Sequence, residues 1–168
     1  MGVRWSTLHK AVFLDRDGVI NRKAPDHDYI KMWSEFSFLP DVPEAICQLN
    51  HAGYLVLVVT NQRGVAKGIM TLSDVEELHQ RMCRKLKQMG AAIDSIYVCP
   101  HDIGQCHCRK PEVGLFLQAE RDFAIDKASS WMVGDSDSDV EAGRRYGVKT
   151  IKTSVLPKAV TKILGDVQ

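Results

Sequence analysis

The fold of this chain is set by the stretch Phe13-Leu-Asp-Arg-Asp-Gly-Val-Ile-Asn21. An apolar run over Ala11–Leu14 predicts a short buried strand, which ends in the carboxylates of Asp15 and Asp17. Residues two apart on an extended strand share a face, so both acids can point the same way. Gly18 then permits a sharp turn of the backbone. Two acids at such a strand end can hold a divalent cation, and one of them can attack an electrophile.

The Asp15-x-Asp17-Gly motif, taken alone, is compatible with other structures. The simplest is a strand followed by a solvated acidic turn, because short motifs recur by chance. A calcium loop is excluded by position, since Val19 and Asp26 stand where a ligand and a bidentate Glu are required. The acidic run at residues 135–139 fails the same test, because Val140 and Tyr146 replace the required Gly and Glu.

The composition is that of an ordinary globular protein, with 45% hydrophobic and 26% charged residues. We expect residues 1–168 to form one domain, because a chain of 168 residues can bury a sizeable core. Lys and Arg number 22 against 21 Asp and Glu, which gives a net charge of +1. This balance predicts neither nucleic acid nor a membrane as a partner, so local cations must meet an anionic substrate.

The sequence also predicts a compartment. No apolar stretch approaches the ~20 residues that span a bilayer. Residues 1–10 contain no apolar signal core or cleavage site, so we expect a cytoplasmic protein. In that reducing compartment, the clustering of Cys99, Cys106 and Cys108 favours a bound metal over disulfides.

Alternating strand and helix signals predict an open α/β sheet that is mostly parallel. The predicted strands span residues 11–14, 54–60, 95–98, 131–134 and 148–152. The predicted helices span residues 41–53, 73–90, 113–125, 140–146 and 157–164. Asp41 is the expected cap of the first helix, and Ser73 with Glu76 forms the expected capping box of the second.

Two polar segments interrupt this alternation. Residues 61–70 are expected to form a polar loop with two glycines, and residues 22–40 a long irregular segment. Long loops in compact domains are often functional. The alternative is that Trp33, Phe36 and Phe38 simply pin the longer segment onto the body of the protein.

Polar groups follow three of the predicted strands and suit phosphoryl transfer together. In parallel sheets, ligands bind beyond the carboxyl ends of the strands. There Asp15 and Asp135 would flank Mg²⁺ in a shell of oxygen ligands. Thr60 and Asn61 offer a hydroxyl and an amide to phosphate oxygens, and Lys110 offers a compact cation to the phosphoryl group.

The chain resembles the haloacid dehalogenase (HAD) superfamily of phosphatases over nearly its whole length. The residues that carry the resemblance are, in family order, Asp15-x-Asp17-Gly-Val, Val59-Thr60-Asn61, Lys110 and Gly134-Asp135-Ser-Asp-Ser-Asp139. The resemblance implies a HAD-like three-layer Rossmannoid fold. For the matching residues it implies Asp15 as the nucleophile and Asp17 as the general acid and base, with the backbone carbonyl of Asp17 on Mg²⁺. It further implies that Thr60 binds the phosphate, that Lys110 binds the aspartyl-phosphate, and that Asp135 binds Mg²⁺. Asp139 would be a supporting acid, and Asp137 an exposed turn residue without a role.

A second metal site is predicted in the cysteine-rich loop. Cys99, His101, Cys106 and Cys108 supply three thiolates and one imidazole, which suit tetrahedral zinc in a closed structural site. His107 lies between two ligands and is less able to turn inward. The alternative is a reduced loop with incidental cysteines. Bound zinc would fix the loop, called the zinc loop below, that presents Arg109 and Lys110 to the phosphate.

A narrower resemblance is carried by DRDGVIN, VVTNQRGVAKG, the Cys-x-His loop, CRKP and MVGDSDSDVEAG. These segments resemble the D-glycero-D-manno-heptose-1,7-bisphosphate 7-phosphatase branch and the related histidinol-phosphate phosphatase domains. The resemblance implies a Mg²⁺-dependent phosphomonoesterase of lipopolysaccharide precursor synthesis without a large cap domain. We also expect a monomer. Three features depart from the heptose enzymes: Arg63 replaces a usual Ser, Ser136 replaces a common Lys, and the zinc loop is short.

Substrate would be held by residues 22–40, residues 61–70 and the zinc loop. The expected substrate-binding residues are Asn61, Arg63, Lys67 and Arg109. Arginine makes bidentate contacts with phosphate, so a second phosphate of the substrate can bind there. Solvated surface cations are the alternative for Arg63 and Lys67.

Three competing functions stay open from the sequence. Histidinol-phosphate phosphatase, or another small sugar-phosphate phosphatase, uses the same chemistry. Polynucleotide 3′-phosphatase is disfavoured, because the chain has no concentrated basic tract for a nucleic-acid backbone. A zinc-stabilised interaction domain without catalysis is disfavoured because all of the predicted catalytic residue types are retained.

Overall fold

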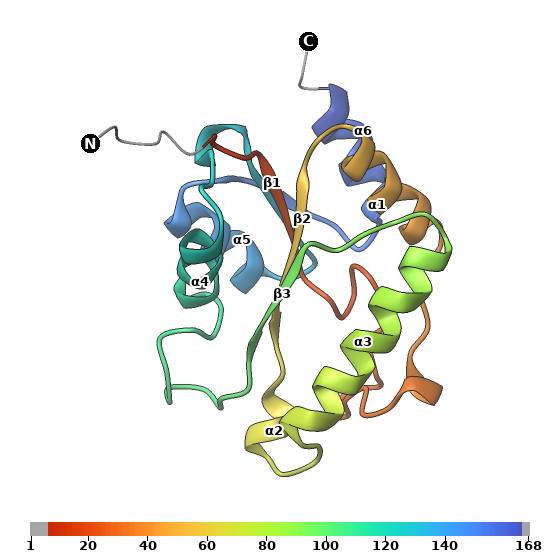
Figure 1. Cartoon of the computed structure of the whole chain (residues 1–168). Helices are drawn as coiled ribbons and strands as arrows, with labels where there is room; N and C mark the ends of the chain where they lie inside the picture. The colour runs from red at the N-terminus through yellow and green to blue at the C-terminus, as the bar shows by residue number, and fades with distance from the viewer. Residues whose placement is uncertain (1–6, 166–168) are drawn as a thin grey trace, which may run out of the picture.

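A computed structural model describes residues 7–165, and its five strands form one parallel sheet (Figure 1). The strands are β1 (Ala11–Leu14), β2 (Leu55–Asn61), β3 (Ser95–Cys99), β4 (Trp131–Gly134) and β5 (Lys149–Lys152). They lie in the order β3-β2-β1-β4-β5, so β1 is central. In register, Phe13 pairs with Leu57 of β2 and with Met132 of β4. The predicted open parallel sheet is therefore confirmed.

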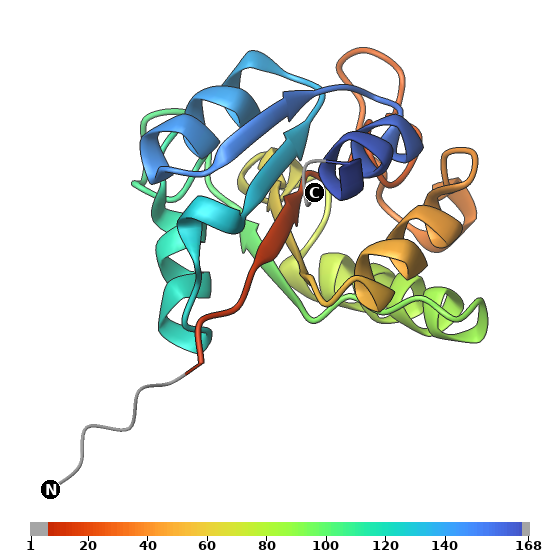
Figure 2. The ribbon, with the colours of Figure 1, turned by 90° about the horizontal axis from the view of Figure 1, so that it is seen from above.

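Helices cover both faces of the sheet (Figures 1 and 2). On one face lie α1 (Val42–His51), α3 (Leu72–Gln88) and α6 (Leu156–Gly165). On the other face lie α4 (Gly114–Asp122) and α5 (Asp137–Tyr146). The remaining pieces are α2 (Arg63–Ala66) and the 3₁₀ turns η1 (Trp33–Glu35) and η2 (Lys127–Ser129). This is the three-layer arrangement that the sequence predicted, with a core on each side of the sheet.

The continuous apolar run of β1 is explained by these two cores. Val12 and Leu14 enter the core under α1, α3 and α6. Ala11 and Phe13 enter the core under α4 and α5, because alternate residues of a strand point to opposite faces. All four side chains are fully buried, as expected for a central strand of a parallel sheet.

Two of the predicted caps are wrong. Asp41 does precede α1, but its backbone is left-handed with φ of 58° and its side chain makes no capping hydrogen bond. The capping box of α3 is formed by Thr71 and Asp74, two residues before the expected pair. Thr71 N–H donates to Asp74 Oδ2 at 2.8 Å, and Asp74 N–H donates to Thr71 Oγ1 at 3.1 Å. The same spacing of hydroxyl and acid occurs twice in this stretch, and the earlier pair starts the helix.

Three predicted element boundaries also differ. The polar loop at 61–70 contains the short helix α2. The third predicted helix, 113–125, ends at Asp122, because His9 forms a parallel bridge with Ile125 and extends the chain there. The fourth, 140–146, begins three residues earlier at Asp137, because Ser136 and Asp139 form a capping box. Asp137 is thus an exposed residue of a first helical turn, paired with Lys152.

Segment 22–40 lies at the carboxyl edge of the sheet, on the side of α2 in Figure 1. Trp33 stacks on Phe36 with 5.0 Å between ring centroids, and Phe36 meets Phe38 edge-on at 5.1 Å. All three rings pack against the core below α1, so they do pin this segment onto the body. Within residues 7–165, no helix is long and apolar enough to cross a membrane. The expectation about a signal at residues 1–10 falls mainly on residues 1–6, outside the described part.

Candidate active site

A buried lysine joins two acids at the carboxyl edge of the sheet. Lys110 follows the cysteine loop, and its Nζ lies 2.9 Å from Asp15 Oδ1 and 2.7 Å from Asp139 Oδ1. The same ammonium donates to the backbone carbonyl of Val59 at 2.7 Å. Only 3% of the surface of Lys110 is exposed. All three ammonium protons thus have acceptors, which fixes the charge beside Asp15.

Three carboxylates crowd around this point and make a candidate cation site. Asp15, Asp135 and Asp139 each offer an oxygen within 4.8 Å of the others. Burial, together with the charge of Asp139, raises the pKa of Asp15 to about 7, although Lys110 opposes this. On the outer side, Lys23 Nζ lies 2.5 Å from Asp135 Oδ2. Crowded carboxylate oxygens, with a raised pKa at Asp15, make a donor set that a hard divalent cation stabilises.

Two glycines allow the carboxylates to come this close. Gly18 has a positive φ of 88°, and a side chain there would overlap the carboxylate of Asp135. Gly134 ends β4, and a side chain there would overlap Asp139 on α5. Gly18 lies in the turn after β1 and Gly134 is the last residue of β4, so the sequence places small residues where backbone and acids approach each other.

Asp17 is held separately, by neutral and cationic donors. Its Oδ1 accepts hydrogen bonds from Arg16 Nη2 and Asn21 Nδ2, both at 2.9 Å. Its Oδ2 accepts from Gln62 Nε2 at 3.1 Å, and the same amide donates to Thr60 Oγ1 at 2.9 Å. Although burial acts in the opposite direction, the charge of Arg16 and these hydrogen bonds lower the pKa of Asp17. Asp17 and Thr60 are therefore connected through one glutamine.

A cavity of about 330 Å³ opens beside Asp17. Three of the four predicted substrate-binding residues line it, namely Asn61, Arg63 and Arg109. Lys67 does not line the cavity; its ammonium lies 5.7 Å from the ring centroid of Tyr29, which does.

Asn61 and Arg63 also make contacts that shape this cavity. Asn61 exchanges two hydrogen bonds with the backbone of Lys110, at 3.1 and 3.2 Å, and so fixes that segment. Arg63 Nε donates to Asp102 of the cysteine loop. Arg63 is therefore neither a free phosphate ligand nor a fully solvated cation, because its charge is shared with a carboxylate.

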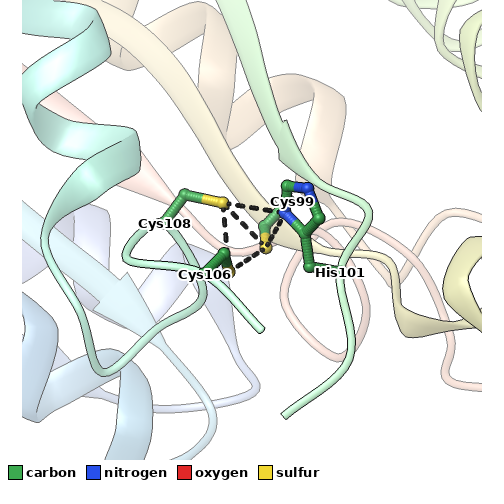
Figure 3. Close-up of side chains that lie close together, drawn as sticks. All are labelled: Cys99, His101, Cys106 and Cys108. Atoms are coloured by element: carbon green, nitrogen blue, oxygen red, sulfur yellow. Dashed lines mark hydrogen bonds between the residues drawn. The ribbon is translucent and has the colours of Figure 1, made fainter. Parts of the chain in front are cut away.

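The cysteine loop gathers its four predicted ligands around one point (Figure 3). The three Sγ atoms of Cys99, Cys106 and Cys108 lie 3.0 to 3.5 Å apart. His101 Nδ1 lies 3.3 Å from Cys108 Sγ and 3.6 Å from Cys99 Sγ. In tetrahedral zinc with Zn–S bonds of about 2.3 Å, sulfur atoms are separated by about 3.8 Å. Slight expansion of the cluster would therefore accommodate zinc.

Electrostatics in the loop also favour a cation. Burial raises the pKa of Cys99 and of Cys108, and the neighbouring thiols raise that of Cys108 further. Burial acts in the same direction on Cys106, but backbone N–H groups of Arg109 and Cys108 lower its pKa to about 6. One thiolate is thus stabilised by the loop itself, and the other two require additional positive charge.

The family model described as polynucleotide kinase 3 phosphatase matches residues 10–157. This match spans most of the chain, and it includes every residue of both clusters. The chain belongs to this family of HAD phosphatases.

Several proteins that resemble this chain are named as heptose bisphosphate phosphatases. The chain is 42% identical over 160 residues to the D-glycero-beta-D-manno-heptose-1,7-bisphosphate 7-phosphatase of Haemophilus ducreyi, covering 90% of this chain and 86% of that protein. It is 44% identical over 148 residues to the Vibrio cholerae protein of the same name, covering 83% and 78%. A crystal structure of the B. bronchiseptica D,D-heptose 1.7-bisphosphate phosphatase, complexed with magnesium and phosphate, matches with a TM-score of 0.81 at 30% identity, covering 94% of this chain and 99% of that one.

The sequence missed part of this HAD phosphatase site. Asp139 was expected only as a supporting acid, whereas its carboxylate contacts Lys110 directly. Arg16, Asn21 and Gln62 were assigned no role, yet they hold Asp17. All three stand within four residues of a motif residue. A polar residue in a stretch that must be buried needs a partner, and this requirement is the signal that points to them.

Proposed function

We propose that the protein is a Mg²⁺-dependent phosphomonoesterase that removes the 7-phosphate of D-glycero-D-manno-heptose 1,7-bisphosphate through an aspartyl-phosphate. The observation that carries the chemistry is the contact of Lys110 with Asp15, beside the carboxylate of Asp135. The substrate is supported by the names of relatives at about 40% identity. We also propose one domain over residues 1–168, which acts as a cytoplasmic monomer.

The proposed reaction has two steps, and both use the same carboxylates. Asp15 attacks phosphorus, so a bond from its oxygen to phosphorus forms while the bond to the substrate oxygen breaks. Asp17 gives a proton to the departing alkoxide from its minor protonated form, because its lowered pKa leaves most of the free protein with this carboxylate ionised. Asp17 then takes a proton from water, which attacks the same phosphorus and releases phosphate with Asp15 regenerated. Lys110 offsets the negative charge that Asp15 shares with the phosphoryl group, and Thr60 donates to a phosphoryl oxygen.

Asp15, Asp135 and the backbone carbonyl of Asp17 would hold the magnesium ion. Bound Mg²⁺ would neutralise charge on the phosphoryl oxygens and favour the ionised form of Asp15. Asp139 belongs to the same acidic cluster, but we assign it to Lys110, to which it is ion-paired at 2.7 Å. Asp139 Oδ2 accepts hydrogen bonds from Ser136 N–H at 3.2 Å and Ser136 Oγ at 2.8 Å in the capping box of α5, which keeps that carboxylate in place.

We further propose that Cys99, His101, Cys106 and Cys108 bind structural zinc. Four ligands leave no open coordination position for catalysis. Arg109 and Lys110 come directly after the last of these ligands, so the zinc loop sets the position of both cations.

The second phosphate of the substrate has a candidate partner in the cavity. Arg109 lines it, and its Nη1 is buried without a hydrogen-bond partner among residues 7–165. An unpaired buried guanidinium N–H is costly, and a phosphate oxygen would satisfy it. We therefore assign Arg109 to that phosphate, with Asn61 as its neighbour. Arg63 and Lys67 would contribute charge near the cavity entrance.

A substrate panel tests this proposal. Phosphate release is measured with heptose 1,7-bisphosphate, histidinol phosphate and a 3′-phosphorylated oligonucleotide, each in the presence of Mg²⁺. We expect the highest kcat/KM for the heptose bisphosphate, and we expect Asp15→Asn to release no phosphate from any of them. A higher kcat/KM for either rival would replace the proposed substrate. Activity that survives in Asp15→Asn would remove the proposed nucleophile.

A further inference from the structure

Arg16 is a fully buried cation that touches a buried histidine. It stands between the two motif acids, and only 1% of its surface is exposed. His79 lies on the inner face of α3 and is 6% exposed. Arg16 Nη1 lies 3.1 Å from His79 Nε2. Neither residue is part of the proposed phosphoryl-transfer chemistry, so this contact needs its own explanation.

The chemistry of the two groups fixes the direction of the hydrogen bond. A guanidinium has only N–H donors, so His79 Nε2 must accept with its lone pair. The imidazole is therefore neutral and carries its proton on Nδ1. Burial, with the charge of Arg16 as a second cause, lowers the pKa of His79 to about 3, in agreement with a neutral ring.

The other side of the same guanidinium holds Asp17. Arg16 Nη2 and Nε lie 2.9 and 3.2 Å from Asp17 Oδ1. Asn21 and Gln62 supply the other two hydrogen bonds to this carboxylate. Because the guanidinium is planar and rigid, a partner that fixes one edge also sets the angle at which the other edge meets Asp17.

We propose that His79 is a positioning residue for proton transfer: through Arg16 it orients the carboxylate of Asp17 toward the oxygen of the leaving group. This inference rests on the proposed role of Asp17 as general acid. It adds α3 to the elements that build the active site, although no residue of α3 is expected to touch the substrate.

A histidine that only filled space would behave differently. Its loss would lower the stability of the fold or reduce turnover of every substrate alike. Loss of orientation at Asp17 would instead lower kcat/KM most for the substrates whose leaving group most needs a proton. An alkoxide needs one, whereas p-nitrophenolate leaves readily without one.

The test compares kcat/KM for heptose bisphosphate and for p-nitrophenyl phosphate, since kcat/KM reports steps up to loss of the leaving group. His79→Leu removes the acceptor, and His79→Asn keeps a polar group that is too short to reach Arg16. His79→Gln places an amide oxygen near the position of Nε2. Leu78→Ala is the matched control, a buried neighbour on α3 whose apolar side chain cannot hydrogen-bond to Arg16. Asp17→Asn is the benchmark for a lost general acid.

We expect His79→Leu and His79→Asn to lower kcat/KM for heptose bisphosphate at least about tenfold, because positioned proton transfer contributes ~10²–10⁴. Their kcat/KM for p-nitrophenyl phosphate should change less than about twofold, and Asp17→Asn should show the same selectivity more strongly. His79→Gln should restore most of the loss. Equal losses on both substrates, a selectivity shared by Leu78→Ala, or failure of His79→Gln to restore activity would each overturn the positioning role.

These outcomes are separate from those that test the function itself. If wild-type protein releases phosphate and Asp15→Asn does not, the phosphatase proposal stands whatever His79 does. If Asp17→Asn shows no dependence on the leaving group, Asp17 is not the general acid and the inference about His79 fails with it.

Discussion

At the scale of single residues, Lys110 connects the acids of the site. Its ammonium is buried, and the charges of Asp15 and Asp139 raise its pKa against the opposing effect of burial. Without this cation, two neighbouring carboxylates would face each other in a dry environment. The sequence predicted only that Lys110 neutralises charge on the phosphoryl group. In the structure Lys110 also stabilises the neighbouring carboxylates of Asp15 and Asp139 when no substrate is bound.

Replacement of Lys110 tests this dual role. We expect Lys110→Met to lower kcat for phosphate release by about 10²–10³, because a preorganised charge at the phosphoryl group is lost. Circular dichroism should show that the variant is folded. Lys127→Met, which removes a partly exposed lysine of η2 at the opposite, amino-terminal edge of the sheet, should leave kcat unchanged. Near wild-type kcat in Lys110→Met would contradict the assigned role.

The close approach of Gly134 to Asp139 leads to a second prediction. Gly134→Ala should reduce the free energy of unfolding by about 1–3 kcal/mol, because the added methyl group must displace the first turn of α5. Urea denaturation measures this. Gly165→Ala is the matched control, since a side chain at Gly165 would meet no atom of residues 7–165 within 4 Å outside its own helix turn. Equal stability of the two variants would show that the approach at Gly134 is not tight.

At the scale of elements, the zinc loop is expected to fold only with its metal. Cys108→Ala should lower the zinc content from about one per chain to near zero and reduce the melting temperature, since three of the four ligands hold zinc weakly. Elemental analysis and thermal denaturation measure both effects. Cys83→Ala, a half-buried cysteine of α3 outside the cluster, should keep its zinc. Full stability of wild-type protein after chelation would contradict structural zinc.

Helix α3 should carry a pH dependence through His79. The pKa of this imidazole falls from 6.5 when unfolded to about 3 in the fold. Between these values only the unfolded chain binds the proton, so the free energy of unfolding falls as pH drops below 6.5. From pH 7 to pH 5, His79 should cost roughly 2 kcal/mol in the wild type and nothing in His79→Gln. Urea midpoints at the two pH values test this, and parallel losses in both proteins would contradict it.

Much of the element pattern could be predicted because local signals decide it. Apolar runs gave all five strands within one or two residues, and glycines ended helices near the expected positions. The failures arose where distant contacts decide. Helix α4 ends early because His9 binds residues 124–126, which no local pattern reveals. The capping box of α3 was ambiguous because two hydroxyl residues have suitable acids at the same spacing.

The site shows the same division. Two clusters could be predicted from short motifs. Asp15 lies beside Asp135 because each follows a strand of the same sheet, and the four predicted zinc ligands lie together because they share one loop. The contacts of Arg16 with His79 and of Gln62 with Thr60 and Asp17 depend on how α3 and β2 pack against β1. Such pairings join residues up to 63 positions apart, so the sequence showed the residues without their partners.

At the scale of the whole molecule, one edge of a parallel sheet gathers groups from the entire chain. β1, β2 and β4 each end in functional residues there, and the zinc loop adds two cations. Within residues 7–165 no large cap domain is inserted between the motifs, so we expect residues 22–40, residues 61–70 and the zinc loop to hold the substrate. The proposed sugar substrate is supported by the names of the relatives at about 40% identity, whereas the family model takes its name from a polynucleotide phosphatase.

The most direct test of the central claim is rapid acid quench of the enzyme during turnover of heptose 1,7-bisphosphate, followed by mass spectrometry of its peptides. We predict one phosphoryl group on the peptide that contains Asp15, and none in Asp15→Asn. A phosphoryl group on any other residue, or steady phosphate release by Asp15→Asn, would contradict the account.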